Sequence, residues 1–162
     1  MAGVFKGRQL SGALGLALLI LMPMSFGCRT GGNPAFTTSG PGWRVREGQA
    51  LWCPKKQMPE IGGELVVASH EDGRCLIEFS KSPLTLAVAQ SSPIGWNILF
   101  PPAGMSFSGA GKPPRRFLWL YLNAALAGKS LPKQIHFQRN SGDRWRLENI
   151  RTGESMEGYL AP

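Results

Sequence analysis

The sequence has few acidic residues, histidines and cysteines. Its 162 residues include 10 Asp and Glu, 2 His and 3 Cys, against 18 Lys and Arg. The spacing of these His and Cys residues matches neither a zinc site nor a Cys-x-x-Cys redox motif. The sequence also holds no G-x-S-x-G turn for a serine nucleophile and no complete phosphate-binding loop. We therefore expect a protein that is not an enzyme, with no catalytic residues, no metal and no other cofactor.

Long hydrophobic runs are scarce as well, and 162 residues allow one domain. Only 17% of the residues are charged, which excludes a highly charged disordered chain. The 21 Gly and 13 Pro favour a β-rich domain with many turns over a large α/β nucleotide-binding enzyme.

The longest apolar run, Leu10–Met22, follows a short segment that carries Lys6 and Arg8 and no acidic residue. Small residues flank Phe26 shortly after this run. A basic start, a short apolar segment and a small-x-small end are typical of a secretory signal peptide, which we predict over residues 1–27. A spanning helix needs roughly 20 apolar residues, so an uncleaved anchor is the less favoured alternative. Export makes nucleic acid an unexpected partner.

Cys28 follows directly after Gly27, and this junction resembles the lipobox of bacterial lipoproteins. In that pattern a signal peptidase cuts before a Cys that then receives acyl chains such as palmitate. Gly27 and Cys28 match its two most restrictive positions, whereas Ser25 and Phe26 depart from the preferred Leu and small residue. The resemblance implies lipidation of Cys28 and attachment to a membrane through it. The alternative is an ordinary signal peptide, whose cleavage leaves Cys28 unmodified.

Without Cys28 the chain keeps an even pair of cysteines, Cys53 and Cys75, in an oxidising compartment. A disulfide between them would close a loop of about 22 residues and contribute about 3 kcal/mol to stability. The alternative is two buried free thiols.

The exported chain divides into a tether and a domain. Residues 28–42 combine the predicted lipid site with a Gly-, Thr- and Pro-rich segment that has no apolar periodicity, which predicts a flexible tether. The single domain then covers residues 43–162. From Glu64 onward, apolar side chains recur at every second position between turn residues. This pattern predicts strands over 64–69, 74–81, 84–88, 96–100, 105–108, 135–139, 144–149 and 155–160.

The period changes over residues 114–127, which read PRRFLWLYLNAALA. Pro114 at its start and Gly128 just past its end favour one long helix, and its apolar residues surround it almost completely, as in a buried helix. Strands, one helix and further strands predict an α+β fold. We expect a curved antiparallel β-sheet, a half-barrel, packed on this one long α-helix and preceded by the signal peptide and tether.

Lys112, Arg115 and Arg116 cluster where the predicted helix begins. The formal net charge of +8 becomes +6 once Lys6 and Arg8 are removed, and a domain this basic attracts phosphates and anionic lipid head groups. The three residues are therefore candidates for binding an anionic partner. The alternative is a solvated loop that keeps the surface soluble.

Large apolar side chains gather on consecutive predicted strands and on the predicted helix. A closed core would use all of them, whereas an incompletely closed sheet would leave a cavity for acyl chains. The candidate residues for lining such a cavity are Phe79, Leu84, Leu86, Val88, Trp96, Ile98, Phe100, Phe107 and Leu120.

The segment Ile61–Val67 (IGGELVV), the hairpins after it, residues 114–127 and the final strands are together similar to the LolA/LolB family of envelope lipoprotein-handling proteins. The similarity covers roughly 100 residues and has no diagnostic catalytic motif. It implies a curved sheet with an apolar cavity that accepts lipoprotein acyl chains. Residues 43–60 depart from the family, because they are too short for its first long helix and first strands.

This resemblance, together with Cys28, predicts an envelope lipoprotein, attached to the outer membrane and facing the periplasm, that binds a lipid or an acylated lipoprotein. A soluble periplasmic or secreted protein is the less favoured location. The alternative function is a membrane-anchored interaction protein that has no ligand cavity and docks onto an envelope complex through its basic loop.

Overall fold

The computed structural model describes residue 38 and residues 40–140 and 143–161. The predicted signal peptide, Cys28 and most of the predicted tether lie outside the described residues. Within the described residues, nine strands form one antiparallel sheet in the order β6-β5-β4-β3-β2-β1-β9-β8-β7. The strands are β1 (Trp43–Cys53), β2 (Ile61–His70), β3 (Cys75–Lys81), β4 (Leu84–Ser91), β5 (Gly95–Phe100), β6 (Met105–Ala110), β7 (Ile135–Arg139), β8 (Arg144–Asn149) and β9 (Glu154–Leu160).

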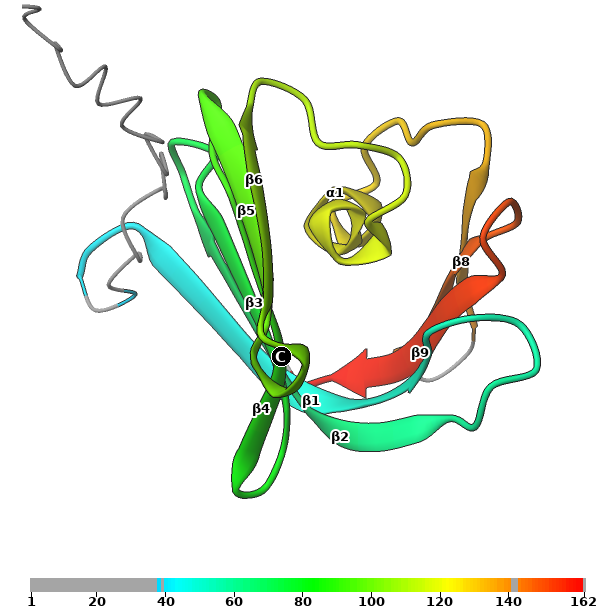
Figure 1. Cartoon of the computed structure of the whole chain (residues 1–162). Coiled ribbons are helices and arrows are strands. Elements are labelled where there is room, and N and C mark those ends of the chain that lie inside the picture. The colour runs from blue at the N-terminus through cyan, green and yellow to red at the C-terminus, as the bar shows by residue number, and fades with distance from the viewer. Residues whose placement is uncertain (1–37, 39, 141–142, 162) are drawn as a thin grey trace, which may run out of the picture.

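The sheet curves into a half-barrel with one strongly apolar face. Figure 1 shows β3 to β6 rising on one side, β9 and β8 on the other, and a short helix between them. Every second side chain of a strand points into this concave face, as Cys75, Ile77 and Phe79 do on β3, where each is at most 2% exposed.

Glycine allows the neighbouring strands β1 and β9 to approach each other closely. A Cβ atom at Gly48 would clash with the backbone oxygen of Tyr159, and one at Gly158 would clash with that of Gln49. Since only glycine fits such a close backbone approach, these residues permit the curvature of the half-barrel.

The predicted α+β fold class is wrong, because the described residues form mainly one nine-stranded antiparallel sheet, and this sheet does not pack on one long α-helix. A 3₁₀-helix η2 (Leu118–Tyr121) and an α-helix α1 (Leu122–Leu126) form one short helical stretch, and residues 114–117 are not helical. In a longer helix the backbone oxygen of Arg115 would accept from the N–H of residue 119. It accepts instead from Asn149 Nδ2 at 2.8 Å and Gln134 Nε2 at 3.4 Å.

The structure also corrects the predicted face of the third expected strand. The two-residue alternation of the sequence predicts that Leu84, Leu86 and Val88 share one face of this strand. A β-bulge opposite the step from Phe79 to Ser80 leaves Leu86 without a register partner, so that Leu86 packs against the core. Val88 pairs with Glu78 on the outer face, and Leu84 is 60% exposed at the hairpin.

The predicted disulfide is absent, because Cys53 and Cys75 are free thiols. Cys53 ends β1, whereas Cys75 pairs with Ser69, which in turn pairs with Arg44 near the start of β1. Strands rise about 3.3 Å per residue, so the two cysteines lie roughly 30 Å apart along the sheet. A disulfide requires Cα atoms within about 7 Å of each other.

Candidate functional site

The concave face of the half-barrel is the site in which most of the predicted cavity residues meet. Six of the nine face the interior without a register shift, and Leu86 joins them through the bulge. Val88 and Leu84 do not take part. The members of this concave cluster are Phe79, Leu86, Trp96, Ile98, Phe100, Phe107 and Leu120.

Residues 111–134, which we call the strap, connect β6 to β7 and cross the concave face (Figure 1). Two aromatic side chains of the strap pack against aromatic side chains on the concave face of the sheet. Trp119 lies 5.3 Å from Trp52 and 5.2 Å from Phe79, measured between ring centroids. Phe117 lies 5.6 Å from Trp96 and 5.0 Å from Phe107. In this closed arrangement the strap's own side chains occupy the apolar face.

A buried carboxylate, that of Glu154 at the start of β9, hydrogen-bonds both to β1 and to the strap. Its Oε1 accepts from Trp52 Nε1 at 3.0 Å, and its Oε2 accepts from the backbone N–H of Leu118 at 3.4 Å. Burial raises the pKa of Glu154 to about 7, although both hydrogen bonds favour the charged form. Glu154 therefore connects β1 and β9 to the strap through a carboxyl group that titrates near neutral pH.

Asn149 supplies a second polar attachment for the strap and is completely buried. Its Nδ2 donates to the backbone oxygen of Arg115, while its Oδ1 accepts from the backbone N–H groups of Arg151 and Thr152. Tyr121 closes the strap on itself by donating from its hydroxyl to the backbone oxygen of Pro113 at 2.6 Å. A few hydrogen bonds thus fix the strap over the apolar face.

The predicted basic cluster lies on the strap, and its three side chains are exposed. Arg116 is engaged with the aromatic rings, since its guanidinium carbon lies 4.7 Å from the centroid of Phe117 and 5.6 Å from that of Phe107. Arg115 is attached through its backbone oxygen. The side chains of Lys112 and Arg115 remain available to an anionic partner.

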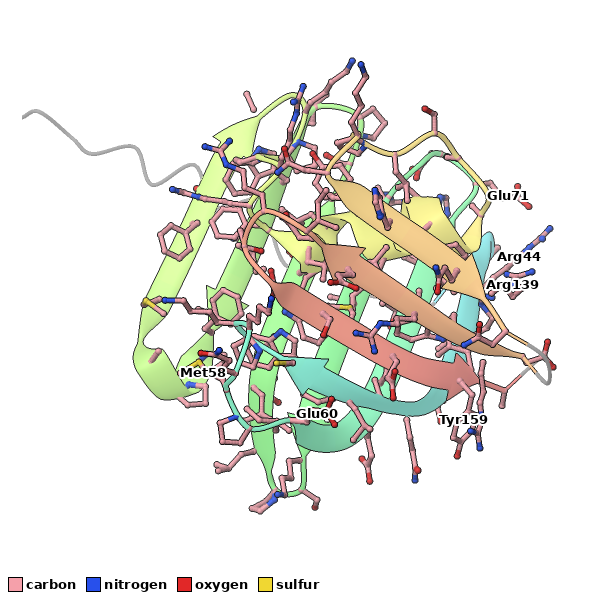
Figure 2. All side chains as sticks on the ribbon, turned by 90° about the vertical axis from the view of Figure 1, so that its right-hand side faces the viewer. Arg44, Met58, Glu60, Glu71, Arg139 and Tyr159 are labelled. Carbon is pink, nitrogen blue, oxygen red and sulfur yellow. The ribbon has the colours of Figure 1, made fainter. Side chains whose placement is uncertain are left out.

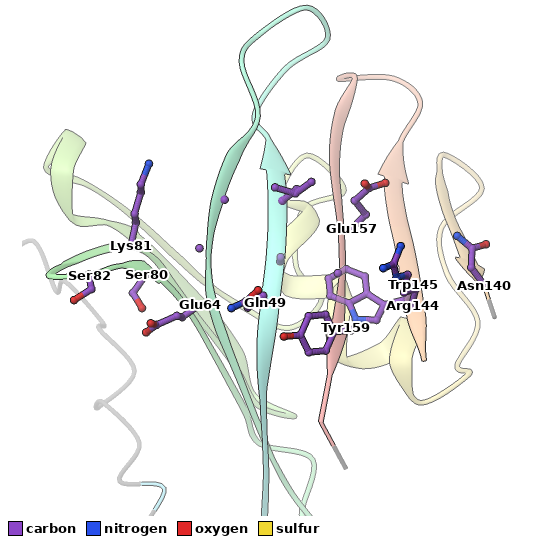
Figure 3. Close-up of a pocket in the computed structure, with 15 residues that line it drawn as sticks. Gln49, Glu64, Ser80, Lys81, Ser82, Asn140, Arg144, Trp145, Glu157 and Tyr159 are labelled. Atoms are coloured by element: carbon purple, nitrogen blue, oxygen red, sulfur yellow. The ribbon is translucent and has the colours of Figure 1, made fainter. Parts of the chain in front are cut away.

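A separate groove of about 580 Å³ lies on the outer face of the sheet. Gln49, Glu64 and Tyr159 line it from three neighbouring strands, with Lys81 on one flank and Arg144 on the other (Figure 3). These side chains alternate along the strands with buried core residues, which places the groove opposite the strap. The lining carries charges of both signs, so it does not select a ligand by charge.

Among the residues that the structure describes, no three His, Cys, Asp or Glu side chains are placed to hold a metal ion. No helix within this part of the chain has the length and hydropathy required to cross a lipid bilayer.

The sequence prediction missed Glu154 and Asn149 as attachments of the strap. The last strand is predicted from the sequence to begin at residue 155, directly after Glu154. A signal was nevertheless available, because Met156 and Leu160 mark the buried face of that strand and Glu154 has the same parity.

No protein-family model matches the sequence, and none of the curated proteins matches it.

Proposed function

We propose that the chain is an exported envelope lipoprotein, attached through Cys28 to the periplasmic side of the outer membrane, that binds the acyl chain of a lipid or of an acylated protein. The acyl chain takes the place of the strap's side chains on the concave face. The protein acts by binding and not as an enzyme. The similarity to the LolA/LolB family and the lipobox-like junction at Gly27–Cys28 support this proposal.

One observation carries it: a nine-stranded half-barrel presents an apolar, aromatic concave face that, within the described residues, a single strap covers. A domain of this size can bury its apolar side chains between two packed layers of secondary structure. Burying one short helix therefore does not by itself require a sheet curved into a half-barrel. The strap's helical stretch is short and has no side-chain hydrogen bond at its N-cap. The strap is held in place by hydrogen bonds to Glu154 on β9 and Asn149 on β8.

The free energy of burying apolar groups sets the length of acyl chain that can replace the strap's side chains. Phe117, Trp119 and Leu120 each contribute about 1.5–3 kcal/mol by being buried. An acyl chain contributes about 0.8 kcal/mol for every buried methylene, so roughly six to eleven methylenes offset the loss of these three contacts. We therefore expect chains of about twelve carbons or longer to bind, and chains of about five carbons or shorter not to compete with the strap.

Two substitutions on β4 test the proposal, because the bulge separates their faces. Leu86→Trp adds volume to the concave face, whereas Val88→Trp places the same ring on the outer face. Palmitate binding, measured by isothermal titration calorimetry, should be lost in Leu86→Trp and unchanged in Val88→Trp. Circular dichroism spectra and urea midpoints establish that both variants fold.

If Leu86→Trp does not fold, Trp119→Ala replaces it in the test. Removing the indole from the concave face frees space that an acyl chain can occupy, so palmitate should bind Trp119→Ala more tightly than the wild type. Equal palmitate affinity in the wild type and in a folded variant of the concave face would disprove the proposal.

One observation favours the alternative function, a docking protein without a ligand cavity. Trp119 is 1% exposed and fills the centre of the concave face. In that case Lys112 and Arg115 contact an acidic partner, and capture of the partner is lost in the Lys112→Ala/Arg115→Ala double variant and at high salt. Palmitate then binds neither the wild type nor Trp119→Ala.

A further inference from the structure

A second, smaller pocket lies at one end of the concave face, where the helix α1 ends. Its volume is about 210 Å³, and its lining includes Arg46, Arg139 and Trp145 together with Leu126 and Leu160. Leu126 and Leu160 also belong to the hydrophobic core, so the pocket continues directly from the apolar interior. The polar residues that line it are not Glu154 and Asn149, which hold the strap.

Two guanidinium groups line this pocket. Arg46 shares the concave face of β1 with Ala50 and Trp52, and its charge lies close enough to Cys75 to favour the thiolate of that residue. Arg139 ends β7 (Figure 2) and donates from Nη2 to the backbone oxygen of Leu126 at 3.3 Å. Among the described residues, no carboxylate lies within ion-pair distance of either guanidinium.

A tryptophan, Trp145, also lines this pocket. Trp145 pairs with Arg139 in the register of β7 and β8 and is 2% exposed. Its indole Nε1 is buried and makes no hydrogen bond within the described part of the chain. Buried N–H groups are nearly always paired, and a bound ligand is one way to satisfy such a group. The exposed carboxyl of Asp143 also borders the pocket and leaves its formal charge at +1.

We propose that this pocket binds a carboxylate or a phosphate group, the anionic head group of the amphiphile whose acyl chain occupies the concave face. Guanidinium groups match the geometry of carboxylate and phosphate oxygens, and the unbonded indole N–H of Trp145 is a further donor at a residue that lines the pocket. The head-group assignment rests on the proposed function, because it requires an acyl chain on the concave face. It narrows the ligand to an anionic amphiphile, with the charged end at Arg46 and Arg139.

The test uses the purified full chain and three probes in phosphate-free buffer at pH 8: dodecanoate, uncharged dodecanol and inorganic phosphate. Isothermal titration calorimetry gives the affinity of each. Wild-type protein should bind dodecanoate about tenfold or more tightly than dodecanol, because charge-assisted hydrogen bonds are the strong ones. Arg139→Gln should remove most of this preference, and Arg46→Gln should do the same. Arg144→Gln, an exposed arginine on the outer face of the neighbouring strand, should leave it unchanged.

Trp145→Phe provides a second test, because it keeps an aromatic ring at this position and removes the N–H donor. Its preference for dodecanoate over dodecanol should fall several-fold, while its affinity for dodecanol stays the same. A variant that is merely destabilised weakens both probes together, which would count against the proposal.

The outcomes separate the head-group site from the proposed function. Equal binding of dodecanoate and dodecanol by the wild type overturns the head-group site and leaves acyl binding in place. Binding of phosphate through Arg139, with no binding of either amphiphile, identifies a site for free phosphate and overturns the proposed function. No binding of any probe overturns both.

Discussion

The indole N–H of Trp52 donates to Glu154 Oε1 at 3.0 Å, across 102 residues of sequence and within the apolar interior of the half-barrel. The other oxygen of the same carboxyl accepts from the first residue of η2. One side chain therefore ties β1, β9 and the strap together. Because burial raises the pKa of Glu154 to about 7, this connection depends on pH.

The first prediction concerns the pH dependence of stability. The folded-state pKa of Glu154, about 7, lies above the unfolded value of about 4.5, so the folded state binds the proton more tightly. The contribution of Glu154 is fully present below about pH 4.5 and is lost as the pH rises to about 7, with a total of about 3 kcal/mol. Glu154→Gln stays neutral at every pH. Urea unfolding should show the variant gaining about 3 kcal/mol relative to the wild type between pH 4.5 and pH 8.

A constant difference between Glu154→Gln and the wild type across this range would contradict the buried, titrating carboxyl. Glu148→Gln on β8 is the matched control, since this glutamate is half-exposed and outside the concave face. Its difference from the wild type should not follow the same pH profile.

The second prediction concerns Trp119, whose indole N–H has no hydrogen-bond partner within the described residues. Trp119→Ala leaves a large cavity between Trp52 and Phe79 and should lower the free energy of unfolding by about 3–5 kcal/mol. Trp119→Phe keeps an aromatic ring and loses no hydrogen bond, so its loss should be less than half as large. Similar losses in the two variants, measured by urea unfolding, would show that the indole N–H is bonded.

The third prediction compares two glycines in the bend of the sheet. Gly158→Ala forces a Cβ atom against the backbone of Gln49 and should lower stability by about 2–4 kcal/mol. Gly62→Ala is the control, because its Cβ would only reach ordinary contact with the Leu51 side chain at 3.4 Å. Thermal unfolding curves distinguish them, and equal midpoints for the two variants would argue against the close approach of β1 and β9.

The fourth prediction concerns Cys53 and Cys75, the free cysteines among the described residues. Cys75 is buried, and burial raises the pKa of its thiol to about 12, so the reactive thiolate is scarce at neutral pH. Cys53 is half-buried at the end of β1, where its Sγ lies 3.1 Å from the backbone oxygen of Lys55. Alkylation by iodoacetamide under native conditions should label Cys53 first and Cys75 only after unfolding. A disulfide-linked peptide containing both residues would contradict the sheet register.

Apolar residues at every second position predicted the strands correctly where a large apolar side chain occupies every inward-facing position. This is why the strands containing Ile77 and Ile98 were placed correctly from the sequence. β1 was missed, because its inner positions hold Arg46, Gly48 and Ala50 before Trp52 and so show no apolar alternation. The bulge at Leu86 was missed as well, since an extra residue in one strand is decided by its partner strand.

The helix prediction failed for a related reason. Residues 114–127 have the composition of a helix, but the backbone oxygen of Arg115 is bonded by Asn149 from another strand, which stops the helix from extending toward Pro114. Propensity yields to such tertiary contacts. The attachment at Glu154 and the arginines of the smaller pocket likewise depend on strands that meet only in the folded chain.

The most direct test of acyl binding under the strap uses the indole N–H signals of the five tryptophans in a ¹⁵N-labelled sample. Substitution of each tryptophan by phenylalanine assigns its signal. On addition of palmitate, the signals of Trp52 and Trp119 should shift together, because the acyl chain displaces the strap's aromatic side chains from the concave face, while that of Trp43, next to His70 at the start of β1, should stay in place. Unchanged signals of Trp52 and Trp119 at saturating palmitate would contradict the account.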